Sequence, residues 1–361
     1  MLNKQTVTDT VVRGQTVLVR VDYNVPTKDG AIVDDLRIRE SLPTIELLQK
    51  KGARRIILVS HLGRPEGKKV PELSLEPIYK RLKELLPGGK VFFVPDVSGP
   101  DVEEAVESLP VGGVLLLENL RFFPGEEENS ADFAKDIVDS THADLFVQDG
   151  FAVVHRAHAS TSAVTAELPS IAGLLLEKEI NGLSKISEAP GKPFVVVIGG
   201  AKVDDKQPLI DKFGKIADTI IVGGKIAADG YTSSAKNVYV AEDFVEGYEG
   251  ELTGKKLDIG PASVEKITEI LAGAKTVLWN GLMGMAEVPE FAGGSVAVAR
   301  AIGTNDKIFS VVCGGDTTGF VENLQKTESE LQFSLISTGG GAALEFLSGE
   351  NLPGIESLED K

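Results

Sequence analysis

The sequence is poor in the residues that build disulfides and metal cages. It has one cysteine, Cys313, and four histidines among 361 residues. A single cysteine cannot form an internal disulfide, which favours a cytoplasmic protein over a secreted scaffold. No apolar run is long enough to cross a membrane, and the first residues lack the apolar core of a secretion signal. These absences predict a cytoplasmic protein that does not bind membranes.

Positive charge is also scarce. Lysine and arginine total 37, aspartate and glutamate total 54, and the net charge is −17. This balance argues against nucleic acid or an anionic membrane as a partner. If such a protein binds a small anion, it must gather its cations locally in a cleft.

Two common nucleotide-binding fingerprints are missing. No G-x-x-x-x-G-K-[ST] motif occurs, which excludes a P-loop protein. No G-x-G-x-x-G motif follows an apolar run, which disfavours a dehydrogenase. Any nucleotide site must therefore use other glycines.

Short apolar runs recur along the chain, and their β-branched residues are continuous rather than alternating. This pattern is typical of strands that are buried on both faces. Examples are the segments 55–60, 114–118, 194–199, 219–223, 276–280 and 308–312. Amphipathic helical stretches such as 41–51 and 263–272 lie between the runs. The alternation predicts an α/β protein with parallel sheets.

The length of 361 residues favours two domains. A helical spacing of apolar residues begins near Ser170 and stops at Pro190-Gly191, which indicates a connecting helix. We expect an N-terminal domain over 1–170, an interdomain helix over 171–189 and a C-terminal domain over 190–345. The remaining residues, 346–361, form a tail that we expect to fold back.

Cationic residues follow several predicted strands in the first half of the chain. In parallel sheets, ligands bind beyond the carboxyl ends of the strands, and arginine forks suit phosphate or carboxylate. The set comprises Arg37, His61, Arg64, Arg121 and Arg156, with Asp22 and Asn24 after the first strand. Each has a simpler alternative: a solvated arginine, a structural histidine or a strand-end turn. His155 and His158 flank Arg156, and metal binding by this pair is weakly supported.

Glycine turns follow predicted strands in the second half, where bare N–H groups can meet phosphates. They lie at 199–202, 223–225, 281–284, 314–317 and 339–341. Lys202 and Lys206 are spaced i, i+4 at an expected helix start, which predicts a triphosphate site. The alternative is a helix cap with solvated lysines. Asp316 is a candidate Mg²⁺ ligand or a plain helix cap.

Taken in order, these motifs resemble the phosphoglycerate kinase family from end to end. The matching pieces are 19–26, 60–65, 117–122, 155–160, 199–203, 258–261, 279–281, 314–317 and 337–342. The resemblance implies two doubly wound parallel-sheet (Rossmann-like) domains joined by a long helix and a closing hinge. It also implies a monomeric enzyme that transfers a phosphoryl group between 1,3-bisphosphoglycerate with ADP and 3-phosphoglycerate with ATP, using Mg²⁺. The C-terminal tail would pack on the N-terminal domain.

By position, the resemblance also implies roles for individual residues. The phosphoglycerate site would comprise Asp22, Asn24, Arg37, His61, Arg64, Arg121 and Arg156. The catalytic residues would be Arg37, Lys202, Gly340 and Gly341. The nucleotide site would comprise Gly199, Ala201, Lys202, Lys206, Gly223, Gly224, Asn280, Glu287, Gly315, Asp316, Thr317 and Gly339. Asp316 would hold the Mg²⁺–nucleotide, and Glu287 would lie at the ribose.

The sequence departs from the family pattern mainly in the segment 225–257, which is several dozen residues shorter than usual. Lys225, Leu282 and Cys313 replace a glycine, a proline and a glycine, and the loop 150–154 differs as well. Since the shortened segment normally walls the adenine pocket, we expect weaker nucleotide affinity or looser base choice. A non-catalytic paralogue that binds phosphate or nucleotide is the alternative, and retention of Lys202, Arg37 and Asp316 counts against it.

Overall fold

The computed structural model describes residues 2–28, 30–88, 90–204, 206–248 and 252–361. Asp205 in the first glycine-rich motif, and 249–251 in the shortened segment, thus lie outside the described residues. The chain divides into two compact units. Unit 1 comprises Met1–Asn181 and Asn351–Lys361, and unit 2 comprises Gly182–Glu350.

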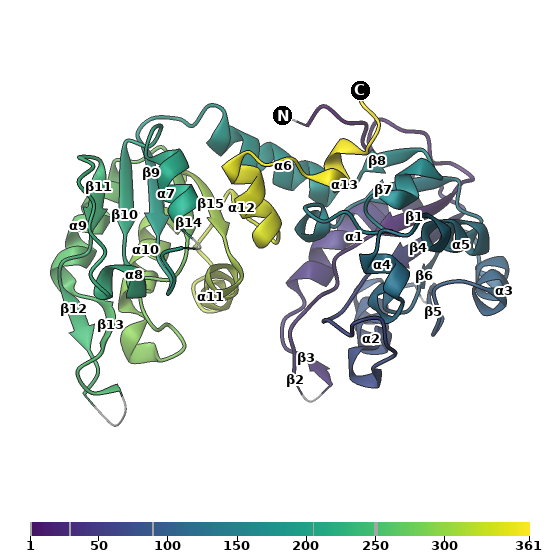
Figure 1. Cartoon of the computed structure of the whole chain (residues 1–361), viewed down its shortest axis with the longest axis horizontal. Coiled ribbons are helices and arrows are strands. Elements are labelled where there is room, and N and C mark those ends of the chain that lie inside the picture. The colour runs from purple at the N-terminus through teal and green to yellow at the C-terminus, as the bar shows by residue number, and fades with distance from the viewer. Residues whose placement is uncertain (1, 29, 89, 205, 249–251) are drawn as a thin grey trace. The chain divides into compact units, whose positions relative to one another are not determined.

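Unit 1 is built on a parallel sheet with the strand order β5-β6-β4-β1-β7-β8. Its strands are β1 Thr16–Arg20, β4 Arg55–Val59, β5 Val91–Phe93, β6 Gly113–Leu116, β7 Leu145–Gln148 and β8 Ser170–Ala172. The main helices are α1 Leu36–Lys50, α2 Glu76–Leu85, α3 Pro100–Ser108, α4 Pro124–Glu127, α5 Ala131–Thr141 and α13 Pro353–Glu356, and β2 Thr27–Lys28 pairs with β3 Ala31–Ile32 (Figure 1).

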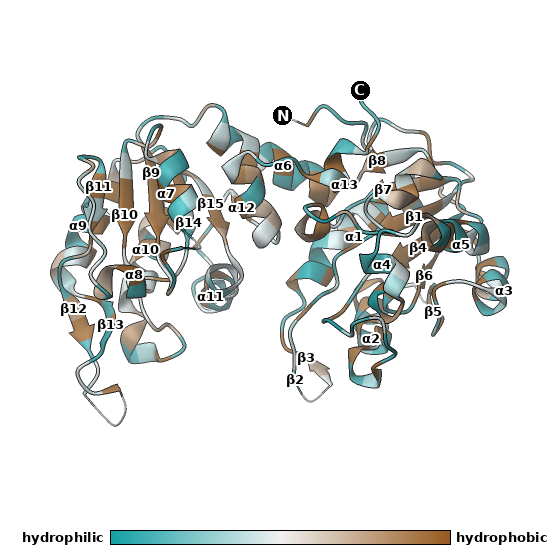
Figure 2. Cartoon of the chain, in the orientation of Figure 1, coloured by the Kyte–Doolittle hydropathy of each residue, from teal (hydrophilic) through white to brown (hydrophobic). Residues whose placement is uncertain are grey.

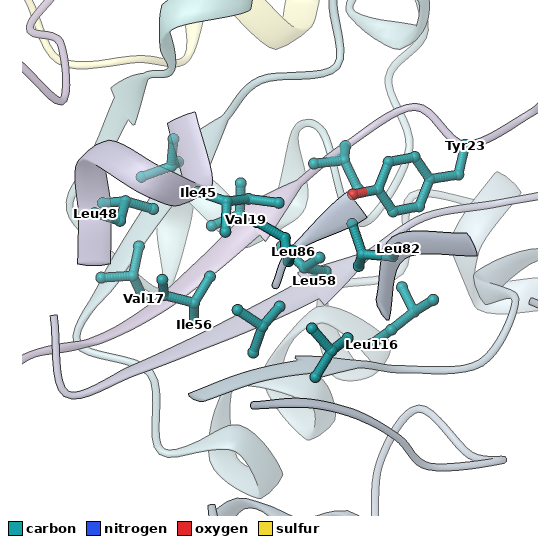
Figure 3. Packing of buried hydrophobic residues seen from close by; sticks show 14 of the residues in the cluster. Val17, Val19, Tyr23, Ile45, Leu48, Ile56, Leu58, Leu82, Leu86 and Leu116 are labelled. Atoms are coloured by element: carbon teal, nitrogen blue, oxygen red, sulfur yellow. The ribbon is translucent and has the colours of Figure 1, made fainter. Parts of the chain in front are cut away.

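The continuous apolar strands of unit 1 arise because both faces of the sheet are covered. Val17 and Val19 belong to one buried cluster, whereas Leu18 belongs to another. Successive side chains of a strand point to opposite faces, so each face needs its own apolar partners. Figure 3 shows Ile45 and Leu48 of α1 against the β1 valines of the first cluster.

Unit 2 repeats this architecture with the strand order β11-β10-β9-β14-β15-β16. Its strands are β9 Phe194–Ile198, β10 Thr219–Val222, β11 Val238–Val240, β14 Thr276–Asn280, β15 Phe309–Cys313 and β16 Leu335–Ile336. The helices are α7 Gln207–Phe213, α8 Gly224–Ala228, α9 Pro261–Ala272, α10 Gly293–Gly303, α11 Gly315–Gln325 and α12 Gly341–Ser348. A separate antiparallel pair joins β12 Phe244–Glu246 to β13 Lys256–Ile259. Figure 2 shows the hydrophobic colouring concentrated along the strands of this sheet.

The predicted interdomain helix over 171–189 is shorter in the structure, because α6 spans Leu174–Ser187. The prediction is wrong at its start, where Ile171 and Ala172 pair in parallel with β7 as part of β8. Ile171 is buried in the sheet, and its spacing from the first leucines of α6 imitates a helical repeat. The division between the units falls within α6, after Asn181.

The C-terminal segment from Asn351 belongs to unit 1. The amide N–H of Gly354 donates to the carbonyl of Val154 at 2.9 Å, and that of Gln5 donates to the carbonyl of Glu359 at 2.8 Å. Both chain ends thus lie in unit 1 (Figure 1). The tail was predicted from 346, whereas 346–348 form the end of α12 in unit 2.

In the part of the chain that the structure describes, no helix combines the length and the apolar character that a membrane span requires.

Candidate active site

The predicted anion-binding residues of unit 1 lie beyond the carboxyl ends of neighbouring strands. Asp22 follows β1, His61 follows β4 and Arg156 follows β7. Since β1 pairs with both β4 and β7, these strand ends are adjacent at one edge of the sheet. Arg37 reaches the same place from the first turn of α1, where its Nη1 contacts the Asp22 carboxylate.

Asp22 and Asn24 also stabilise the turns around them. The amide N–H of Asn24 donates to Asp22 Oδ1 at 3.1 Å, and the amide N–H of Gly63 donates to Asn24 Oδ1 at 2.9 Å. The simple alternative of a strand-end turn therefore applies to part of each side chain. The same bonds fix the loop after β1 against the loop after β4.

The cations of unit 1 form one cluster around His61. Its ring is buried, and burial lowers the pKa of His61 well below the usual value. The positive charges of Arg20, Arg121, Arg37 and Arg156 lower this pKa further. A histidine that stays neutral among arginines offers one hydrogen-bond donor and one acceptor rather than a positive charge.

The other predicted arginines differ in how firmly they are held. Arg121 is buried, donates to the carbonyl of Gly63 at 2.9 Å and lies 3.2 Å from Glu127. Arg156 is half-buried and donates through Nε to His155 Nε2 at 3.1 Å. Arg64 is exposed and makes no hydrogen bond or ion pair with any described residue. Arg64 is therefore the one predicted arginine that the structure leaves outside the cluster.

Two buried charged residues beside this cluster were missed by the sequence analysis. Arg20, the last residue of β1, is fully buried and donates to His61 Nδ1 at 3.1 Å. Glu126 is fully buried in α4 and accepts from the backbone and hydroxyl of Ser160 at 3.0 and 2.7 Å. His158 Nδ1 lies 3.8 Å from Glu126, and burial with the nearby arginines lowers the pKa of His158 to about 4. An arginine that ends an apolar strand was the only signal available for Arg20.

Unit 2 carries a cavity of about 780 Å³ at the carboxyl ends of its strands. Its walls come from the turns after β9, β14 and β15, together with α8 and β13. The predicted residues that line it are Ala201, Lys202, Lys206, Glu287, Gly315, Asp316 and Thr317. The other predicted nucleotide residues, Gly199, Gly223, Gly224, Asn280 and Gly339, are not part of its lining.

The glycines of these turns serve two different purposes. A Cβ on Gly199 or Gly281 would overlap a backbone carbonyl oxygen of the other turn, so both are needed for close packing. A Cβ on Gly315 or Gly340 would meet nothing within 4 Å. Of these two, Gly315 also lines the cavity, so its open space is available to a ligand there. Gly340 precedes α12, whereas the N–H of Gly339 already donates to Ser337 Oγ at 3.1 Å.

Lys202 and Lys206 both line the cavity, but the predicted reason is wrong. The helix α7 begins only at Gln207, so Lys202 lies in the loop before it rather than one helical turn from Lys206. Lys202 is exposed, whereas Lys206 is half-buried and its Nζ contacts Asn280 Oδ1. Asn280 is fully buried and donates through Nδ2 to the carbonyl of Cys313 at 2.9 Å. Asn280 thereby fixes the end of the Lys206 side chain at the cavity wall.

Asp316 lies in the first turn of α11, whose capping residue is Gly314. It is exposed at the cavity wall and is not the helix cap that the simpler alternative proposed. Thr317 is buried and its Oγ1 accepts from the N–H of Gly281 at 2.9 Å, which ties two strand-end turns together. No cluster of three or more histidine, cysteine or acidic side chains able to hold a metal occurs among the described residues.

The shortened segment still contributes to the cavity. Lys225, Asp229, Lys255 and Lys256 line the side formed by α8 and β13. Lys225 Nζ lies 2.6 Å from Asp229 Oδ2, and Lys256 lies 4.5 Å from the centre of the Phe244 ring. This wall therefore carries four charged side chains next to the apolar Ala228 and Leu257.

Comparison with known proteins assigns the chain to a family. The phosphoglycerate kinase family model matches residues 7–256 and 229–350. The chain is 42% identical to the phosphoglycerate kinase of Fervidobacterium nodosum over 404 aligned positions, covering 100% of this chain and 99% of that protein. It is 40% identical to that of Dictyoglomus turgidum, covering 98% of each protein.

Solved structures agree with the sequence comparison. The phosphoglycerate kinase of Pyrococcus horikoshii OT3 superimposes with a TM-score of 0.86 at 30% identity, and that of Coxiella burnetii with 0.79 at 33%. Each comparison covers 98% of both chains. With two parallel α/β sheets and these full-length matches, the chain belongs to the phosphoglycerate kinase family.

Proposed function

We propose that the two sites of this phosphotransferase divide the substrates between them. Unit 1 binds 3-phosphoglycerate or 1,3-bisphosphoglycerate, and unit 2 binds ATP or ADP. The main support is charge: a protein of net charge −17 gathers Arg20, Arg37, Arg121 and Arg156 around His61. Asp22, Glu126 and Glu127 offset part of this charge, and an anionic ligand would offset more of it.

On the phosphoglycerate side, Arg37, Arg121 and Arg156 supply the charge for the substrate phosphate and carboxylate. Arginine forks can meet such groups with two parallel hydrogen bonds. His61 adds a neutral donor, and Asp22 and Asn24 contact the substrate hydroxyl. Arg64, exposed and free of described partners, adds a further cation when the substrate is bound.

On the nucleotide side, Lys202 and Lys206 contact the phosphates beside the open glycine Gly315. Lys202 is exposed and unconstrained, which suits a side chain that follows a moving phosphoryl group. Lys206 is held by Asn280, which suits a fixed phosphate ligand. Glu287, at the cavity wall, accepts hydrogen bonds from the ribose.

Mg²⁺ fits the carboxylate of Asp316. Magnesium is commonly bound through one or two carboxylates together with substrate phosphates and water, rather than by an all-protein cage. Asp316 offers one exposed carboxylate at the cavity wall, next to Gly315 and close to the lysines in the lining. Bound there with the nucleotide, Mg²⁺ would neutralise part of the phosphate charge.

Phosphoryl transfer asks little covalent chemistry of the protein and much positioning and charge balance. Arg37 steadies the transferring group from the phosphoglycerate side, and Lys202 follows it from the nucleotide side. The backbone N–H groups of Gly340 and Gly341 are further donors. The closing hinge, the monomeric state and the cytoplasmic location stay predictions.

Binding measurements test the division of substrates directly. By calorimetry, Arg121→Met should weaken 3-phosphoglycerate binding at least tenfold and leave MgADP binding unchanged. Lys206→Met should weaken MgADP binding at least tenfold and leave 3-phosphoglycerate binding unchanged. A matched control is Lys215→Met, on an exposed lysine of unit 2 that is not part of the cavity lining.

If either variant weakens both ligands equally while its thermal midpoint is unchanged, the substrates are not divided as proposed. If the wild type binds both ligands but has no turnover in a coupled assay, the chain is a non-catalytic paralogue.

A further inference from the structure

Arg20 is an unusual residue to find inside a sheet. It ends β1, and none of its surface is exposed. Its Nη1 donates to the carbonyls of Val21 at 3.0 Å and Val59 at 3.3 Å. No described carboxylate lies within ion-pairing distance of it, and its Nε has no partner. Burying a guanidinium in this way costs free energy that an apolar residue would not require.

The remaining contact of Arg20 is with His61. Nη2 of Arg20 lies 3.1 Å from His61 Nδ1. An arginine carries only donors and stays protonated, so Nδ1 must accept with its lone pair. A neutral imidazole that accepts at Nδ1 carries its proton on Nε2. The contact therefore fixes the tautomer of His61.

The charged surroundings of His61 reinforce this state. Asp22 Oδ1 is 3.8 Å from Nδ1, too far for a hydrogen bond that would pull a proton onto that nitrogen. Arg20, Arg121, Arg37 and Arg156 all oppose a second positive charge on the ring. No hydrogen bond from any described residue reaches His61 Nε2, so the Nε2–H remains available to a ligand.

We propose that Arg20 is a positioning residue that holds His61 as the neutral Nε2–H tautomer, so that the ring donates one directed hydrogen bond to an oxygen of bound phosphoglycerate. This inference rests on the proposed function, because it assigns the substrate of unit 1 as the acceptor. Arg20 acts through His61 and the backbone, and it does not itself touch the substrate. The ring therefore gives the substrate a donor that does not titrate near neutral pH.

The test reads the ring state directly. In ¹⁵N-histidine NMR of the full chain, assigned with a His61→Gln variant, wild-type Nδ1 should be pyridine-type and Nε2 pyrrole-type. Both signals should be unchanged from pH 8 to pH 5.5. In Arg20→Met the ring should gain Nδ1–H beside Asp22 and titrate closer to its ordinary pKa. The KM for 3-phosphoglycerate should then rise about tenfold, the loss expected for one well-aligned hydrogen bond, with a smaller effect on kcat.

Two further variants separate positioning from general stability. Arg20→Lys keeps a donor toward Nδ1 and should restore the Nε2–H ring and most of the substrate affinity. Arg54→Met removes an exposed arginine next to the amino end of β4. It should change neither the protonation of the His61 ring nor the KM for 3-phosphoglycerate.

A protonated Nδ1 in the wild type would overturn the proposal. So would a folded Arg20→Met variant with an unchanged ring state and an unchanged KM. If Arg20→Met does not fold, the spectra of the wild type and of Arg20→Lys test the proposal, because both should show His61 protonated on Nε2 only. Because the ring is read without substrate, a chain that lacks turnover but keeps the Nε2–H ring contradicts the proposed function and still supports the assignment to Arg20.

Discussion

At each candidate site a fully buried polar side chain holds one of the predicted ligand-binding residues in place. Arg20 supports His61 in unit 1, and Asn280 supports Lys206 in unit 2. Arg20 and Asn280 are each fully buried at the last position of a central strand. The strand end gives the buried group a fixed backbone, so the side chain it contacts has fewer orientations to lose when a ligand binds.

For Asn280→Ala we expect weaker nucleotide binding. Lys206 loses its partner and is free to adopt other rotamers, so the KM for ADP should rise about tenfold, equivalent to one hydrogen bond to a charged group. Steady-state kinetics at saturating phosphoglycerate measure this change. Asn305→Ala, a half-buried asparagine outside the cavity lining, is the control. An unchanged KM for ADP in a folded Asn280→Ala variant would contradict the role given to Asn280.

Among single residues, the sequence predicts the polar ones that follow apolar runs, whether buried or exposed, better than the charges buried within a strand or helix. Asp22, His61 and Lys202 follow apolar runs, and the ends of parallel strands converge, so their positions could be predicted. Arg20 and Glu126 could not, because burial of a charge depends on neighbours from distant segments. Ser160 and His61, which contact them, come from other parts of the chain.

The glycines of the strand-end turns have two different roles, and the sequence alone does not distinguish them. Gly281 has a φ of +100° and no room for a Cβ beside Gly199. Gly315 has open space and lines the cavity. The sequence shows two similar glycines, whereas the packing distinguishes them.

The two alanine substitutions should therefore behave in opposite ways. Gly281→Ala should lower the free energy of unfolding by roughly 3 kcal/mol, through backbone strain and overlap. Gly315→Ala should change it by less than about 0.5 kcal/mol but raise the KM for ADP, because the methyl projects into the cavity. Urea denaturation and steady-state kinetics measure the two quantities. Equal destabilisation by both substitutions would contradict the difference in packing, and an unchanged KM for ADP in Gly315→Ala would contradict a role of Gly315 in nucleotide binding.

Two element boundaries were predicted wrongly for a related reason. Ile171 fits a helical repeat but pairs with β7, and Lys202 precedes α7 rather than belonging to it. Local spacing cannot reveal a sheet partner elsewhere in the chain, here Val147. Residues spaced i, i+4 share a face only within a helix, and Lys202 lies in the loop between β9 and α7.

The charged wall formed by α8 and β13 leads to a prediction about base choice. In the shortened segment the charged pair of Lys225 and Asp229 lines the cavity next to the apolar Ala228 and Leu257, and neither kind of side chain distinguishes adenine from another purine. We expect kcat/KM for GDP and inosine diphosphate to lie within about tenfold of that for ADP, a difference of about 1.4 kcal/mol. Steady-state assays with the three diphosphates measure the ratio. A kcat/KM for ADP far more than tenfold above that for the other two diphosphates would contradict this prediction.

At the scale of the whole molecule, one buried carboxylate couples stability to pH. Asp149 accepts from Thr44 Oγ1 and from the N–H of Leu175, both at 2.9 Å, and so joins α1 to the start of α6. Burial raises the pKa of Asp149 to about 7. Between about pH 4 and pH 7 the folded chain keeps a proton that the unfolded chain loses. This group therefore lowers the free energy of unfolding as pH rises through that window, and the loss is complete above it.

Asp149→Asn should remove this pH dependence. Relative to the wild type, the variant should gain stability between pH 5 and pH 8, by at most about 1.4 kcal/mol for each pH unit within the window. Urea denaturation at both pH values gives the difference, and Asp139→Asn, an exposed carboxylate paired with Lys135, is the control. A stability difference that is the same at both pH values would mean that Asp149 does not hold its proton in the folded chain.

The overall architecture could be predicted from the sequence better than the details of the candidate sites. Continuous apolar runs, an ordered set of motifs and the chain length together predicted two parallel α/β domains of this family, and the family and the fold are confirmed. The shape of the cavity was not predictable, because the wall from α8 and β13 depends on how a shortened segment packs. Residues 225 and 255–257 reach the same cavity although about thirty positions separate them.

The central claim is that this chain transfers a phosphoryl group with Lys202 as a catalytic residue. Turnover of 3-phosphoglycerate with MgATP, followed in a coupled assay, tests it for the wild type and for Lys202→Ala, with Lys215→Ala as the exposed control. Loss of one donor that stabilises the transition state costs about 10²–10³ in kcat. We predict a loss of at least 100-fold for Lys202→Ala and none for Lys215→Ala. Undiminished turnover in Lys202→Ala, or a wild type without turnover, would contradict the account.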